Sequence, residues 1–79
     1  MTTNYVTDVN AIKKVMIDRN ITSISMLSEL SGVNRDTLGR ILSEKEQPTA
    51  TTMYKLADTL QLTATQAGNI FFRKNLRTA

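Results

Sequence analysis

The sequence contains no cysteine, no histidine and no tryptophan. These absences exclude disulfide bridges, thiolate or imidazole metal sites, and nucleophile pairs that depend on histidine. The remaining carboxylates are scattered, so we expect neither an enzyme nor a site for a cofactor or metal. The 79 residues include only three glycines and one proline, so residues that interrupt secondary structure occur at only a few positions. No apolar run approaches the roughly 20 residues of a membrane span.

Positive charge is in modest excess. The net charge of +3 and the isoelectric point of about 9.6 are compatible with nucleic acid binding but do not require it. No acidic residue follows Asp58, so residues 73–79 are predicted to form a basic tail. The N-terminal MTTNYVTDV lacks the features of a signal peptide. We therefore expect one soluble cytoplasmic domain over residues 1–79, with its core at about 8–72.

Apolar residues recur at intervals of three and four, which is typical of amphipathic helices, and strand-like alternation is weak. This spacing predicts a compact all-α bundle of five short helices, over about 8–19, 24–31 and 35–43, with a fourth beginning after Thr49 and a fifth after Thr63. Each expected helix follows a residue suited to cap an N-terminus: Thr7 or Asp8, Ser23, Asn34, Thr49 and Thr63. Gln66 completes a capping box with Thr63.

The same spacing predicts which side chains face the core. They are Val9, Ile12, Val15, Met16, Leu27, Leu30, Leu38, Ile41, Leu42, Met53, Leu56, Ala57, Leu60, Ala67, Ile70 and Phe71. Met26 is also predicted as core filler, like Met16 and Met53. Lys13, Lys14 and Arg19 are interpreted as ordinary solubilising charge.

The segment from Ser23 to Leu42 is the most informative part of the chain. Two short helices meet there at Gly32, where a left-handed residue is needed. Val33 fills the corner, and Asn34 caps a second helix whose outer face is polar. This arrangement is typical of a helix-turn-helix, which places its second helix in the major groove of DNA.

A helical wheel of about 100° per residue separates the two faces of the helix at about 35–43. Its outer face carries Asp36, Gly39, Arg40 and Ser43, with Thr37 on the flank. Arg35 is less far round the wheel, but its long side chain projects from the first turn, which Asn34 caps. We predict that these seven residues bind DNA. Arg35 and Arg40 are the first candidates for reading guanine, because its O6 and N7 accept a bidentate arginine. Lys45 and Lys55 are candidates for contacts with the phosphate backbone, or else are solvated surface charge.

Three of these residues have a second interpretation. Asp36 accepts from a cytosine amino group or, as we favour, holds Arg40 through an i,i+4 ion pair. Gly39 either lets the helix backbone approach a base edge or is a tolerated small residue that costs about 1 kcal/mol relative to alanine. Asn34 is chiefly a helix cap, and a phosphate contact is its second possible role.

The chain resembles the lambda-repressor-like helix-turn-helix domain of phage repressors, Cro-type proteins and related bacterial regulators. The resemblance covers about Ile12 to Phe71 and is carried by ISMLSELSGVNRDTLGRIL, Pro48-Thr49 and MYKLADTLQL. It implies a four- or five-helix bundle that binds duplex DNA sequence-specifically as a dimer. A small Cro-like repressor of a bacterial cell or phage-infected host is the favoured interpretation. The alternative is a protein-interaction module on the same scaffold, such as an antitoxin or regulatory partner.

Four positions depart from the family pattern. Ile24 stands where many members carry glutamine, and Glu44 stands where glycine is common. Met16 and Leu42 replace a buried arginine–glutamate pair. Because an apolar pair is often as stable as the buried ion pair that it replaces, we predict that Met16 and Leu42 touch in the core.

Phe72 is predicted to lie off the core stripe of the last helix. On the wheel, Ile70 lies within about 60° of Ala67, whereas Phe72 lies about 140° away. An exposed phenylalanine indicates a partner surface. We predict a weak two-fold dimer through Phe72 and Ile70 that reads a near-palindromic operator. The alternative is that Tyr5 or Leu76 covers Phe72 within one monomer.

Overall fold

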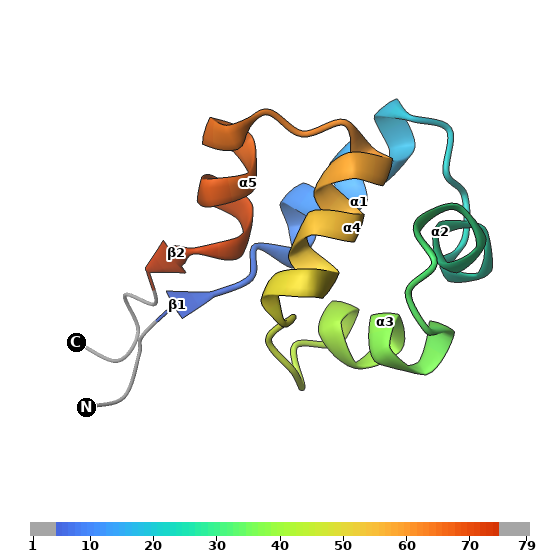
Figure 1. Cartoon of the computed structure of the whole chain (residues 1–79), viewed down its shortest axis with the longest axis horizontal. Coiled ribbons are helices and arrows are strands. Elements are labelled where there is room, and N and C mark those ends of the chain that lie inside the picture. The colour runs from blue at the N-terminus through green and yellow to red at the C-terminus, as the bar shows by residue number, and fades with distance from the viewer. Residues whose placement is uncertain (1–4, 75–79) are drawn as a thin grey trace.

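The computed structural model describes residues 5–74, which form five helices and two short strands (Figure 1). The helices are α1 (Val9–Asp18), α2 (Ile24–Ser31), α3 (Arg35–Leu42), α4 (Ala50–Leu60) and α5 (Ala64–Phe71). The strands are β1 (Tyr5–Val6) and β2 (Arg73–Lys74). The predicted bundle of five short helices is therefore confirmed. None of these helices combines the length and the apolar character that crossing a membrane requires.

Each helix begins after one of the predicted capping residues. Asp8, Ser23, Asn34, Thr49 and Thr63 each accept a hydrogen bond from a backbone N–H two or three residues further on. At α1 the cap is Asp8 rather than Thr7, since Asp8 Oδ1 accepts from the Ala11 amide at 3.2 Å. Thr63 and Gln66 form the predicted capping box. These bonds are local, so the helix starts follow directly from the sequence.

Four helices end at a left-handed residue, and only one of these residues is glycine. Their φ angles are 60° at Asn20, 75° at Gly32, 64° at Glu44 and 55° at Gln61. After α3, the Glu44 amide donates to Ile41 O at 3.1 Å and the Lys45 amide donates to Arg40 O at 2.9 Å. These two bonds define a Schellman motif, in which glycine is usual at the place of Glu44. The left-handed conformation costs a residue with a Cβ atom roughly 1–2 kcal/mol.

We expect the Glu44→Gly variant to be more stable than the wild type by about 0.5–1 kcal/mol. Glycine relieves the strain at φ 64°, and the more flexible unfolded chain offsets part of this gain. Urea denaturation measures the change. The matched control is Ser43→Gly, one residue earlier, where φ is −95° and any residue fits. The control should lose stability, and a loss of equal size in both variants would refute the strain at Glu44.

One apolar cluster forms the core. The most deeply buried side chains are all predicted core residues: Ile12, Leu27, Leu38, Ile41, Leu56, Leu60 and Phe71. Val15, Leu42, Met53 and Ala67 are partly buried and pack against this cluster. Because α2 packs against both α3 and α4, it fixes α3 along one edge of the domain (Figure 1).

The prediction of a buried Leu30 and a buried Met26 is wrong. Leu30 is 60% exposed and Met26 is 38% exposed, whereas Leu27 is completely buried. The eight-residue α2 presents only a narrow stripe to α3 and α4, and Leu27 fills it. Met16 is buried and Leu42 packs against the same cluster, while a direct contact between these two side chains stays a prediction.

Arg19 has a structural role that the sequence did not reveal. Its Nε donates to Leu60 O at 3.1 Å and its Nη2 donates to Gln61 O at 3.5 Å. These carbonyl groups lie at the C-terminal end of α4, where a cation interacts favourably with the helix dipole. Arg19 therefore ties the end of α1 to the end of α4 rather than serving only as solubilising charge.

A short antiparallel ribbon joins the two ends of the described chain. Tyr5 pairs with Lys74 and Val6 pairs with Arg73. Arg73 also forms an ion pair with Asp8, with 2.9 Å between Nη1 and Oδ2. Arg73 and Lys74, predicted as the start of a basic tail, thus belong to β2, and residues 75–79 lie outside the described part. Two-residue strands show no readable alternation, so the sequence could not predict the ribbon.

Candidate nucleic-acid interface

The residues predicted to contact DNA lie on the outer side of α3 and beyond its ends. Asn34, Arg35, Asp36, Arg40, Ser43, Lys45 and Lys55 are exposed, and Thr37 and Gly39 are half-buried. On the inner side of α3, Leu38 and Ile41 are each 1% exposed. The helix can therefore present a polar face to a ligand while its apolar face stays anchored in the core.

An open hollow of about 480 Å³ lies beside α3. It brings together six of the nine predicted residues: Arg35, Asp36, Gly39, Arg40, Ser43 and Lys45. Ile24, the first residue of α2, completes the lining. The predictions did not include Ile24 among the site residues, because it replaces the glutamine with which many members of the resembled family contact the DNA backbone. Lys55 comes from α4 and does not line this hollow.

Asn34 acts as the cap of α3. Its Oδ1 accepts from the Asp36 amide at 2.7 Å and from the Thr37 amide at 3.4 Å. The side-chain oxygen is therefore already engaged, while the amide NH₂ group remains a donor. This geometry favours the interpretation of Asn34 as a helix cap.

The predicted ion pair between Asp36 and Arg40 does not form. Arg40 Nε instead donates to Glu46 Oε1 at 2.9 Å, and Arg40 Nη2 donates to Thr37 Oγ1 at 3.3 Å. Asp36 makes no ion pair within residues 5–74. Glu46 reaches Arg40 because the chain reverses at Glu44, and a pattern of spacing along one helix cannot represent that turn.

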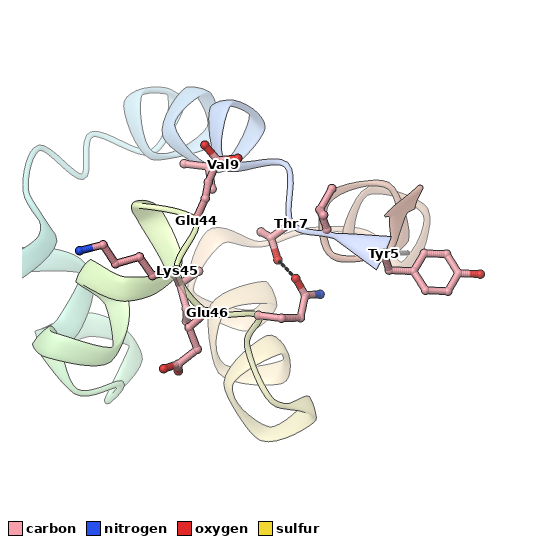
Figure 2. A pocket seen from close by; sticks show the side chains of 9 residues that line it. Tyr5, Thr7, Val9, Glu44, Lys45 and Glu46 are labelled. Carbon is pink, nitrogen blue, oxygen red and sulfur yellow. Dashed lines mark hydrogen bonds between the residues drawn. The ribbon is translucent and has the colours of Figure 1, made fainter. Parts of the chain in front are cut away.

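The turn after α3 is fastened to both ends of the described chain. Thr7 Oγ1 donates to Gln47 Oε1 at 2.8 Å, and Gln47 Nε2 donates to Phe71 O at 2.8 Å. These bonds border a second hollow, of about 200 Å³, between β1 and the turn. Lys45 and Glu46 also line this hollow, and Figure 2 shows that their side chains extend from the turn away from β1. The fastening thus fixes the backbone from which both side chains project.

Acidic and basic side chains balance on α3 and its flanks. Residues 34–47 carry three basic side chains, Arg35, Arg40 and Lys45, and three acidic ones, Asp36, Glu44 and Glu46. This segment is therefore formally neutral, although the whole chain carries +3. Such a surface attracts a polyanion less than a purely basic one, so hydrogen-bond geometry contributes more to its selectivity.

Comparison with protein families gives a match that covers most of the chain. Residues 11–66 match a family described as the Cro/C1-type HTH DNA-binding domain. This range includes the whole of α2, α3 and α4 and all nine predicted DNA-contacting residues. Comparisons with curated proteins and with solved structures found no match. A domain of the matched family binds DNA and is not an enzyme. Because the match extends over more than half of the chain, the predicted resemblance is confirmed, and the chain belongs to the Cro/C1-type helix-turn-helix DNA-binding domain family.

Proposed function

We propose that this protein is a sequence-specific transcriptional regulator that binds duplex DNA with α3 in the major groove. Specifically, we propose a small, phage-type, Cro-like repressor that acts in the cytoplasm of a bacterial cell or a phage-infected host. The grouping of six predicted DNA-contacting residues around the hollow beside α3 carries the proposal. A polar face with two arginines suits base edges, whereas the alternative protein-interaction module would call for a more apolar face.

Selection of bound sequences from a random duplex pool tests this function. We expect one class of near-palindromic sequences to be enriched. The affinity for that class should fall linearly on a plot of log affinity against log salt concentration, because phosphate contacts release counterions. Failure to enrich any duplex sequence would contradict the proposal and would favour the protein-interaction module.

We further propose that the regulator forms a weak two-fold dimer through an aromatic patch made of Tyr5 and Phe72. Phe72 is 53% exposed and Tyr5 is 51% exposed, although their rings meet edge to face with centroids 5.9 Å apart. Tyr5 thus contacts Phe72 within the monomer without covering it, and Leu76, the other residue considered for that role, lies outside the described residues. Ile70 was predicted at this interface but is only 5% exposed, since it turns into the core. A two-fold dimer places two recognition helices about one DNA turn apart, ~34 Å.

The Phe72→Asp variant should weaken this dimer. A carboxylate in the aromatic patch would be desolvated by association, so sedimentation should show a lower average mass at high protein concentration. Cooperative binding to a duplex with two half-sites should also fall. Tyr54→Asp is the matched control, because Tyr54 is an exposed aromatic residue on α4. If Phe72→Asp and the wild type sediment alike and bind with equal cooperativity, the dimer does not use this patch.

The Gly39→Ala variant separates the two interpretations of Gly39. A Cβ atom at this position meets nothing within 4 Å, so packing inside the domain does not require glycine. We expect alanine to stabilise the fold by about 0.5–1 kcal/mol through helix propensity. Duplex affinity should nevertheless fall, because the new methyl group stands where the helix backbone approaches a base edge. Gly68→Ala on α5, which also has open space, is the control. Unchanged affinity in Gly39→Ala would mean that Gly39 is merely a tolerated small residue.

A further inference from the structure

The turn after α3 returns the chain toward the outer face of that helix. Glu44 adopts φ 64°, and the Lys45 amide donates to Arg40 O at 2.9 Å. This reversal carries Glu46 to Arg40, where the carboxylate accepts from Nε at 2.9 Å. Figure 2 shows the Glu46 side chain extending from the turn away from β1. Backbone geometry therefore directs the Glu46 carboxylate toward a residue that we expect to read DNA.

The contacts of Arg40 occupy one edge of its guanidinium group. Nε donates to Glu46 and Nη2 donates to Thr37 Oγ1 at 3.3 Å. A guanidinium carries five N–H donors in a planar fork. Nη1 makes no hydrogen bond among residues 5–74, and it forms with Nη2 the edge that can bind two acceptors end-on. Guanine presents such a pair of acceptors, O6 and N7, in the major groove.

The charge of Glu46 also affects the choice between base and backbone. A phosphate brought to Arg40 places a second full negative charge near the Glu46 carboxylate, whereas a guanine edge carries only partial charges. The carboxylate therefore opposes a phosphate contact more strongly than a base contact. The formal neutrality of residues 34–47 points in the same direction, since it lowers the attraction of this surface for any duplex.

We propose that Glu46 is a positioning residue that, together with Thr37, orients Arg40 toward one guanine and disfavours contacts between Arg40 and phosphate. The inference rests on the proposed function, because it requires α3 to lie in the major groove. Glu46 itself touches no base in this scheme. It increases selectivity both by raising the affinity for the specific site and by lowering the affinity for unrelated DNA.

The test compares Glu46→Ala and Glu46→Gln with the wild type. Sequences are selected for each protein, and affinities are measured for the wild-type site, its single-base variants and an unrelated duplex. In Glu46→Ala, preference for guanine at one base pair should fall by about three- to tenfold, while affinity for the unrelated duplex rises. Glu46→Gln retains the acceptor Oε1 and should keep part of that preference. Asp18→Ala removes one charge at the end of α1, away from the residues that line the hollow beside α3, and should leave base preference unchanged.

The possible outcomes distinguish a failure of the positioning role of Glu46 from a failure of the proposed function. Unchanged base preference in Glu46→Ala would overturn the positioning role. Stronger binding of Glu46→Ala to every duplex, including the specific site, would also overturn it, because Glu46 would then only mask Arg40. If the wild type itself selects no duplex sequence, the proposed function fails, and the inference fails with it. A loss confined to one base pair cannot come from general destabilisation, which the thermal midpoints report separately.

Discussion

Replacing Leu38 with alanine should lower the free energy of unfolding by about 2–5 kcal/mol. Leu38 is 1% exposed and belongs to the core cluster, so the truncated side chain leaves a cavity on the inner side of α3. A small domain has a total stability of only about 5–15 kcal/mol. The thermal midpoint should therefore fall by at least about 10 °C, and the variant should be partly or largely unfolded at physiological temperature.

The matched control for this variant is Leu30→Ala. It makes the same chemical change on the neighbouring helix, but Leu30 is 60% exposed. Its stability should change by no more than about 0.5 kcal/mol. Urea denaturation of both variants measures the difference. Equal losses in the two variants, or an unchanged midpoint for Leu38→Ala, would show that Leu38 does not anchor α3.

The second large effect is expected for Arg40→Ala, which should weaken binding to the selected duplex by about 1–3 kcal/mol. The loss should be greatest at one base pair, because a bidentate contact with guanine identifies that base. The fold should change little, since the ion pair between Arg40 and Glu46 is exposed and such pairs contribute little to stability. Competition titrations with single-base variants of the site measure both the loss and its position.

Lys55→Ala provides the comparison for Arg40→Ala. Lys55 is exposed on α4 and does not line the hollow beside α3, so a contact with the backbone is the role expected of it. Its removal should weaken all duplexes similarly and reduce the salt dependence by about one phosphate contact. An Arg40→Ala variant that keeps the base preference of the wild type would contradict the reading role of Arg40.

The candidate site was predictable where it depends on one helix. The wheel of α3 placed Asp36 and Arg40 outside and Leu38 inside, and the structure has the same division. The partner of Arg40 was not predictable in the same way. The i,i+4 spacing on one helix predicted Asp36 as the partner of Arg40. The carboxylate that binds Arg40 instead belongs to Glu46, which follows a left-handed turn. Because position 44 carries glutamate and not the glycine that usually marks such a turn, no clear signal in the sequence indicated it.

The core residues were likewise predictable only in part. Helical spacing correctly selected Leu27, Leu38 and Phe71, because an amphipathic stripe marks the side that leaves water. It also selected Leu30, three residues after Leu27 on the same helix, but the Leu30 side chain is 60% exposed. The width of a stripe depends on how neighbouring helices cross it. That information is absent from the helix itself.

The sequence by itself determined where the helices begin, which main apolar face each one buries, and to which family the chain belongs. Caps, capping boxes and helical stripes are interactions between residues a few positions apart, so they can be recognised without knowledge of the fold. Only the tertiary structure decided the ribbon of β1 and β2, the tie from Arg19 to the end of α4, and the hold of Glu46 on Arg40. Each of these contacts forms after the chain has reversed direction, and the geometry of such a reversal depends on the packing of the whole domain.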